Sequence, residues 1–237
     1  MVGVGAGGKE SVLAQLVAVD VMTGDTVVDV CIQPGRPVTD WRTAFSGLTE
    51  RSFRRYARRK KLLGSVQEAR EELFKYVDAS TVLVGHAVDN DLGVLEMDHD
   101  FILDTQLVAK LAVEEVHGGE ITVLYKLRTM CLDLLHRWIQ IGPGHDCTED
   151  TFATRELLLF IDEQMREAEE DNLWLDWAWD RAWEVSHPED IDVWRLKPGH
   201  PRRLQYEAAL DKYQARAHLD TLGTPGPNAI SITQEVW

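Results

Sequence analysis

Aspartate and histidine side chains, which can transfer protons, follow ordered segments at two places in the sequence. Asp91 comes shortly after the apolar stretch Thr81–Gly85, near the expected start of a helix. His145 follows the loop Gly142-Pro143-Gly144, and Asp150 stands five positions later on the expected first turn of another helix. Each segment therefore presents an acid–base group at the end of an ordered element.

A third segment, residues 41–49, is an expected loop that carries many hydrogen-bonding groups after a strand. Each of the three segments also has a simpler interpretation. Asp91 or Asp150 would stabilise a helix merely by its negative charge near the helix N-terminus, and an isolated loop histidine such as His145 is usually solvated. The functional hypothesis therefore depends on all three segments occurring in one order on one fold.

The elements that would position these groups alternate between strands and helices. β-prone residues predict antiparallel strands over Ser11–Met22 and Thr26–Gln33, joined by a turn at residues 23–25. The wholly apolar Thr81–Gly85 predicts a buried central strand. The other expected elements are a helix capped by Ser65-x-x-Glu68, a short helix through Leu92 and Leu95, a strand at Phe101–Leu103, and helices from Thr105, over Leu124–Trp138 and from about Thr148. This order predicts an α/β fold with a mixed sheet.

The composition narrows the class of protein. The 237 residues include 25 Lys+Arg against 40 Asp+Glu, a formal charge of -15, and 44% hydrophobic residues. These fractions exclude wholesale disorder, and no apolar run reaches the roughly 18 residues of a transmembrane helix, so no membrane partner is expected. The acidic charge argues against nonspecific coating of nucleic acid, because phosphate binding needs Lys and Arg.

Neither the glycine pattern near the start of the chain nor the cysteines indicate a bound cofactor. Gly3-x-Gly5-x-x-Gly8 matches the dinucleotide-binding pattern, but no strand precedes it, so a flexible turn is expected there. The three cysteines are odd in number and form no Cys-x-x-Cys pair. They indicate reduced thiols in the nucleus or cytosol and argue against a zinc site.

Positive charge is concentrated in one basic strip, residues 51–61, which holds seven of the 25 basic residues and no acid. Such a strip on an acidic body can guide a polyanion. Arg58-Arg59-Lys60-Lys61 also matches a nuclear-import signal, and a solvated helix face is the third interpretation. We expect a nuclear location, with the cytoplasm as the alternative.

Taken in order, the segments resemble the DEDDh 3′-5′ exonucleases with a ribonuclease H-like fold, in particular the RNA exonuclease 4-like branch. The resemblance spans about residues 1 to 160. The matching segments are Gly85-His86 through Asp91-Leu92, Leu103-Asp104-Thr105, Arg42-Thr43-x-Phe45-Ser46-Gly47-Leu48-Thr49 and His145-x-x-x-x-Asp150.

The resemblance implies a two-metal phosphodiester hydrolysis with Mg²⁺ or Mn²⁺. It implies that Asp91 and Asp150 are metal ligands and that His145 is the general base, with His86 structural. The loop Phe45, Ser46, Gly47, Leu48 and Thr49 would lie along the terminal nucleotide. Apart from the resemblance, the positive charge of the basic strip suggests that Arg54, Arg55, Arg58 and Arg59 bind substrate phosphates. The implied partner is single-stranded RNA, with DNA as the alternative.

The chain departs from the family pattern at its first motif, Asp-x-Glu. Asp20-Val21-Met22 has methionine where glutamate is needed, whereas Met1-Val2-Gly3 matches the residues that usually follow the motif. We therefore expect that the sequence starts just after two metal ligands, that the gene encodes Asp-x-Glu upstream, and that this chain hydrolyses nucleic acid poorly. The sheet would also expose an apolar edge at Ser11–Met22. The alternative is a noncatalytic RNA-binding or scaffold protein.

The expected domains are residues 1–165, an exonuclease domain lacking its first strand, and residues 166–237, a C-terminal extension that is helical and then loop-like. Six of the eight tryptophans lie in this extension, among acids and prolines. They are expected to pack against the domain; a surface for a protein partner is the alternative.

Overall fold

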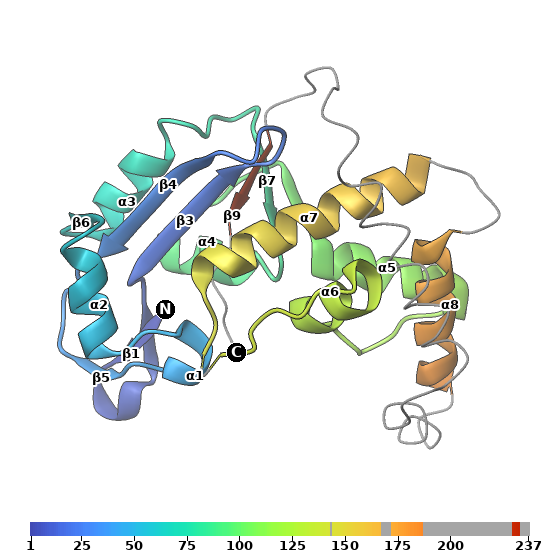
Figure 1. The fold of residues 1–237 in the computed structure, drawn as a ribbon, viewed down its shortest axis with the longest axis horizontal. Helices are drawn as coiled ribbons and strands as arrows, with labels where there is room; N and C mark the ends of the chain where they lie inside the picture. The colour runs from blue at the N-terminus through green and yellow to red at the C-terminus, as the bar shows by residue number, and fades with distance from the viewer. Residues whose placement is uncertain (143, 167–171, 187–228, 233–237) are drawn as a thin grey trace.

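The computed structural model describes residues 1–142, 144–166 and 172–186, and the backbone of residues 229–232. It is a mixed α/β fold, as the sequence predicts (Figure 1). The strands are β1 (Val2–Val4), β2 (Glu10–Val12), β3 (Gln15–Asp20), β4 (Thr26–Ile32), β5 (Val38–Asp40), β6 (Lys61–Leu63), β7 (Val82–Gly85), β8 (Ile102–Asp104) and β9 (Ala229–Ile232). The helices are α1 (Thr43–Ser46), α2 (Glu50–Ala57), α3 (Val66–Leu73), α4 (Asp89–Leu95), α5 (Thr105–His117), α6 (Leu127–Leu135), α7 (Cys147–Arg166) and α8 (Leu173–Ser186), with a 3-10 turn η1 at Ala6–Gly8.

The main sheet has six strands in the order β6-β4-β3-β9-β7-β8. β3 and β4 form the predicted antiparallel hairpin, and the Asp20 carboxylate accepts hydrogen bonds from the Met22 and Thr23 amides at 2.9 and 2.8 Å. β9 pairs antiparallel with β3 and parallel with β7. The C-terminal strand therefore joins the two halves of the sheet, and it covers the edge of β3 that we expected to be exposed.

The predicted long strand Ser11–Met22 is wrong, because the chain changes sheet in the middle of it. β2 ends at Val12 and pairs with β1 in a small sheet of order β2-β1-β5, whereas β3 begins at Gln15 in the main sheet. Leu13 and Ala14 lie between the two strands, and both are buried.

The opening glycine segment is also more ordered than the predicted turn. β1 begins at Val2, and the side chains of Val2 and Val4 are fully buried. The turn itself follows, because Gly5, Gly7 and Gly8 have positive φ angles.

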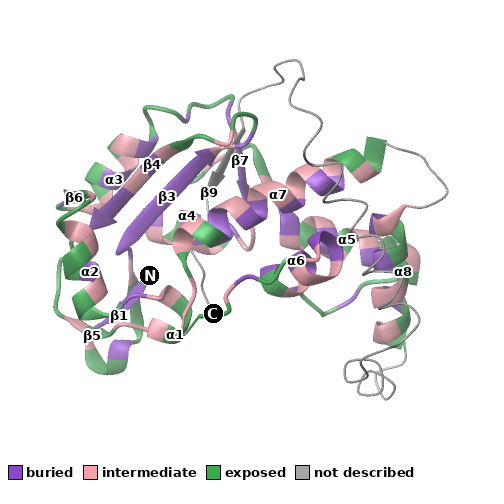
Figure 2. Cartoon of the chain, in the orientation of Figure 1, coloured by how far each residue is buried: buried purple, intermediate pink, exposed green. Residues whose placement is uncertain are grey.

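Helices cover both faces of the main sheet. α3 and α4 pack on one face through a core that includes Leu16, Leu73 and Leu92. α7 crosses the other face over β3, β9 and β7 (Figures 1 and 2). Arg155 of α7 donates a hydrogen bond to the Val21 carbonyl at 2.6 Å, which fixes the helix on the end of β3. α7 begins at Cys147, so this packing sets the position of Asp150 in its first turn.

A second core lies among α5, α6, α7 and α8. On α8 the side chains of Trp174 and Trp177 are buried, and their rings stack with centroids 5.3 Å apart. The Trp177 indole donates to Asp133 at 3.2 Å, whereas Trp179 is 62% exposed. Residues 187–228, which include Trp194, lie outside the described residues, so the domain boundary at residue 165 stays a prediction.

No helix in the described part of the chain has the length and apolar character needed to cross a membrane.

The central position of β9 makes the sheet sensitive to this strand. Ile230 is paired with Asp20 of β3 and with Leu83 of β7. Proline has no backbone N–H and does not fit a central strand, so Ile230→Pro should lower the free energy of unfolding by about 3 kcal/mol. Urea unfolding followed by circular dichroism measures this difference, with Ile230→Val as the matched control that keeps the backbone donor. Equal midpoints for the two variants would contradict the central role of β9.

Candidate active site

Asp91 is held at the carboxyl end of β7 by the connection to α4. This connection contains Ala87 with a positive φ of 58°. The carboxylate of Asp104 accepts hydrogen bonds from the amides of Ala87 and Val88 at 3.1 and 3.0 Å, and it also accepts from Gln106 as the N-cap of α5. Asp91 follows in the first turn of α4 and is only 2% exposed. The predicted placement of this carboxylate is confirmed.

Asp150 is a second buried carboxylate, in the first turn of α7. Its Oδ1 accepts a hydrogen bond from the Gln140 side chain at 3.0 Å, and its Oδ2 lies 3.8 Å from Nδ1 of His145. Burial raises the pKa of Asp150 to about 7, because desolvation opposes the charged form. Such a carboxyl group favours a positive partner more strongly than an exposed one does.

His145 stands directly before α7 with its imidazole largely buried. Its pKa is lowered, first by burial and then by the positive charges of Arg128 and Lys126. The imidazole is therefore neutral near pH 7, which is the protonation state that a general base needs.

The segment around α1 and the segment before α7 are in close backbone contact. A Cβ atom at Gly47 would lie 1.8 Å from the His145 carbonyl oxygen, and one at Gly144 would lie 2.0 Å from the Thr43 carbonyl oxygen. Only glycine permits this approach at both positions. As a result the ring of Phe45, which is 46% exposed, lies 6.4 Å from the His145 ring.

The other residues of the predicted nucleotide loop mainly build the loop itself. The Ser46 hydroxyl donates to the Trp41 carbonyl at 2.6 Å, and Leu48 is buried. Thr49 is the N-cap of α2, and its hydroxyl accepts from the Ser52 amide at 3.0 Å. Phe45 is thus the residue of this loop whose ring is in contact with the ring of the candidate base.

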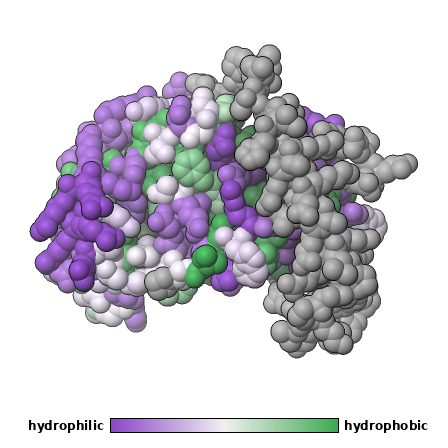
Figure 3. All heavy atoms as spheres, viewed as in Figure 1, coloured by the Kyte–Doolittle hydropathy of each residue, from purple (hydrophilic) through white to green (hydrophobic). Residues whose placement is uncertain are grey.

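The arginines of the basic strip line a hollow on α2. This hollow has a volume of about 560 Å³, and Figure 3 shows the hydrophilic surface over α2. Arg54 pairs with Glu50 at 2.5 Å, and the Arg55 guanidinium lies 5.4 Å from the Tyr56 ring. The strip is not one helix, because α2 ends at Ala57 and Lys61 begins β6. The residues that line the hollow are Glu50, Arg51, Arg54, Arg55, Arg58 and Arg59.

The two buried carboxylates share one environment, but they do not complete a metal site by themselves. The negative charges of Asp150 and Asp91 both raise the pKa of the Cys147 thiol, after the larger effect of its burial. Carboxylate oxygens are suitable donors for Mg²⁺ or Mn²⁺. Within the described residues, however, no group of three or more His, Cys, Asp or Glu side chains is close enough to hold an ion.

His86 belongs to the framework beside the site. Its Nδ1 lies 2.9 Å from the Thr105 hydroxyl, which itself donates to the Gly85 carbonyl at 3.1 Å. Burial lowers the pKa of His86 to about 4, so the ring is neutral at physiological pH. This placement agrees with the structural role that we expect for His86.

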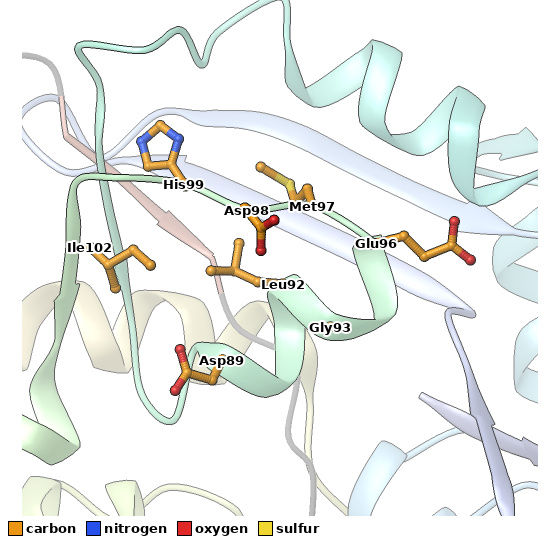
Figure 4. Close-up of a pocket in the computed structure, with 8 residues that line it drawn as sticks. All are labelled: Asp89, Leu92, Gly93, Glu96, Met97, Asp98, His99 and Ile102. Carbon is orange, nitrogen blue, oxygen red and sulfur yellow. The ribbon is translucent and has the colours of Figure 1, made fainter.

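A separate acidic pocket of about 360 Å³ lies beside α4 (Figure 4). Asp91, Asp150 and His145 are not among the residues that line it, so it is distinct from the candidate active site. The lining residues are Asp89, Leu92, Gly93, Glu96, Met97, Asp98, His99 and Ile102.

Sequence reasoning missed three residues that shape the site. Gln140 binds the Asp150 carboxylate, and Gly144 permits the approach of the two loops. Arg128 acts on the His145 imidazole from α6. The Gly142-Pro143-Gly144 pattern signalled a tight loop, but no local pattern showed what the loop contacts.

Known proteins that are similar to this chain in sequence are named as nucleases. No family model matches the chain. The human protein "Apoptosis-enhancing nuclease" is 32% identical over 177 residues, which cover 73% of this chain and 51% of that protein. "Small RNA degrading nuclease 2" of Arabidopsis thaliana is 30% identical over 161 residues, or 63% of this chain and 33% of that protein. The chain thus spans about half, or less, of the length of these relatives.

The fold is that of a known exonuclease. The pseudoubiquitin hydrolase-RNA exonuclease module of Saccharomyces cerevisiae Pan2, in complex with A7 RNA, matches with a TM-score of 0.60 and 17% sequence identity, over 83% of this chain and 31% of that chain. The Pan2 catalytic unit of Neurospora crassa matches with a TM-score of 0.58. The predicted ribonuclease H-like fold is therefore confirmed, and the homologues of this chain are nucleases and exonucleases.

The loop contact at Gly47 gives a direct test of the site's construction. Gly47→Ala should lower the free energy of unfolding by about 1–3 kcal/mol, because its φ of 61° disfavours alanine and its Cβ would collide with the His145 backbone. Urea unfolding measures the change. Gly93→Ala is the matched control: nothing lies within 4 Å of its Cβ in α4, so it should be neutral or stabilising. A stable Gly47→Ala variant would contradict the close contact of the two loops.

Proposed function

We propose that this chain is a DEDDh-type 3′-5′ exonuclease domain that acts on single-stranded RNA. The observation that carries the proposal is the arrangement of a neutral, largely buried His145 beside the buried carboxylate of Asp150, with the exposed Phe45 ring on the adjoining loop. Its relatives include proteins named as RNA exonucleases, such as "RNA exonuclease 3" of Candida albicans, which is 29% identical over 149 residues. A candidate base, a buried carboxylate and an exposed aromatic ring suit hydrolysis at a nucleotide end.

In this proposal the protein's own residues bind the nucleotide and move one proton. His145 takes a proton from the attacking water, since its lowered pKa leaves one of its two ring nitrogens unprotonated near neutral pH. The Asp150 carboxylate, 3.8 Å from the imidazole, stabilises the imidazolium that forms. Phe45 stacks on the terminal base, as exposed aromatic rings do in other single-strand binding sites.

We further propose that this chain, with the residues named above, hydrolyses RNA slowly. Mg²⁺ or Mn²⁺ remains part of the proposed chemistry, but Asp91 and Asp150 are fewer carboxylates than the resemblance requires. Within the described residues, no group of three or more His, Cys, Asp or Glu side chains lies together, which favours the second candidate function, a noncatalytic RNA-binding protein that keeps the exonuclease fold. The first candidate hydrolyses RNA and the second does not, whereas both bind RNA.

Incubation of the purified chain with 5′-labelled single-stranded RNA and Mn²⁺ separates them. We expect slow shortening from the 3′ end that His145→Ala reduces by about 10²-fold or more. RNA binding in EDTA should persist in this variant. His117→Ala, at the exposed end of α5, is the matched histidine control and should leave the rate unchanged.

The other possible outcomes would each contradict a different part of the proposal. Rapid stepwise shortening that Asp150→Asn abolishes would show that the low-activity part is wrong. Binding without any shortening would favour the noncatalytic candidate. Absence of both binding and shortening would overturn the proposed function.

The basic strip on α2 should contribute nonspecific affinity for RNA. If its arginines contact phosphates, replacing Arg54, Arg55, Arg58 and Arg59 with alanine weakens binding and flattens its salt dependence, by about 0.7 in log–log slope for each lost contact on a single strand. Titrations at several salt concentrations measure the slope. An unchanged slope would leave the import signal or a solvated face as the role of the strip. The charge-matched control replaces four exposed cations elsewhere: Lys9, Arg36, Lys75 and Arg166.

A further inference from the structure

A tryptophan and an arginine that the family resemblance does not include lie together near the candidate base. Arg128 is in the first turn of α6, and Trp138 follows the end of that helix. The Arg128 guanidinium lies 6.0 Å from the centroid of the Trp138 ring, within the range of a cation–π contact. Trp138 is nevertheless 60% exposed, so most of this large apolar ring faces solvent.

Arg128 carries an exposed positive charge on α6. No ion pair to Arg128 occurs among the residues that the structure describes, although several other exposed arginines, such as Arg54 and Arg137, have acidic partners. Arg128 is exposed in the first turn of α6, so its guanidinium is accessible to an anion from solution.

Trp138 is linked to the same site through the backbone. It stands two positions before Gln140, whose side-chain amide donates to Asp150 and whose backbone amide donates to Glu149 at 2.8 Å. The segment that carries the indole is thus tied at a neighbouring residue to the first turn of α7. An exposed aromatic ring and a nearby cation, next to the segment that is tied to Asp150, are the two components of single-strand binding sites.

We propose that Arg128 and Trp138 form a nucleotide-binding contact beside His145, in which the indole stacks on a base of the single strand and the guanidinium binds an adjacent phosphate. This inference rests on the proposed function, and it adds a second aromatic contact to that of Phe45. Stacking tolerates any base, so the contact increases affinity without selecting a sequence. Arginine adds a phosphate contact with planar hydrogen-bonding geometry.

A simpler interpretation is that the pair only stabilises the end of α6. The two interpretations differ in what Trp138→Ala and Trp138→Phe do to binding and to stability. A stacking contact loses affinity with alanine and keeps most of it with phenylalanine. A purely structural contact changes the unfolding midpoint and leaves the affinity of the folded protein unchanged.

The experiment measures binding of the full chain to fluorescein-labelled single-stranded RNA in EDTA, so that no hydrolysis occurs. We expect Trp138→Ala to weaken binding about tenfold and Trp138→Phe to weaken it about twofold. Arg128→Ala should also reduce the slope of log affinity against log salt by about 0.7, whereas Trp138→Ala should not. Trp179→Ala, an equally exposed tryptophan on α8, is the matched control and should bind as the wild type does.

Tryptophan fluorescence provides a second readout if Trp138→Ala does not fold. RNA should quench the emission of the wild type, and Trp138→Phe should lose most of this quenching while it keeps most of its affinity. Wild-type affinity in both Trp138→Ala and Arg128→Ala would overturn this inference alone. Absence of RNA binding by the wild type would overturn the inference together with the proposed function. Binding without hydrolysis would leave the inference standing.

Discussion

The backbone hydrogen bonds that unite the main sheet pass through β9, which lies between β3 and β7. One half of the sheet, β6-β4-β3, leads into the segment with α1, α2 and Phe45. The other half, β7-β8, carries Asp91 and the Asp104 carboxylate that fixes the turn before α4. α7 packs on β3, β9 and β7 and carries Asp150 in its first turn, and His145 lies two residues before the helix begins. The candidate site therefore depends on two half-sheets being held in register by a strand from the C-terminal end of the described chain.

Burial sets the electrostatics of the site. Asp91 and Asp150 are each 2% exposed, which removes the water that would otherwise stabilise their charges. The same desolvation raises the pKa of Asp150 and lowers the pKa of His145. Both pKa shifts favour the neutral forms of the two side chains. Charge in the site would therefore come from a bound partner. This physical preference is consistent with a divalent cation and a polyanionic substrate binding together.

The distribution of charge explains how an acidic protein can approach such a substrate. The chain carries a formal charge of -15, yet the arginines on α2 line one continuous hollow. Arg128 and Lys126 add positive charge on the side of α6. In the proposed function, long-range repulsion from the acidic body would disfavour binding elsewhere, whereas these local cations would favour it on their own surfaces. Specific placement of a nucleic acid therefore needs no basic net charge.

The sequence by itself determined the elements whose signals are local. The apolar run of β7, the N-cap at Ser65 and the positions of Asp91 and Asp150 in first turns of helices follow from patterns within a few neighbouring residues. The order of motifs also indicated the ribonuclease H-like fold, because several spacings had to agree. These features could be predicted since propensity, capping and periodicity act over short distances along the chain.

Only the tertiary structure decided which distant segments meet. Leu13 and Ala14 look like strand residues, but the packing of two sheets divides their segment into β2 and β3. β9 pairs with β3 in the middle of the main sheet, although the two strands are more than 200 residues apart along the chain. The approach of Gly47 to His145 likewise joins segments with no shared local pattern. Such contacts depend on the shape of the whole core, since their partners are chosen by packing and backbone pairing rather than by neighbouring residues.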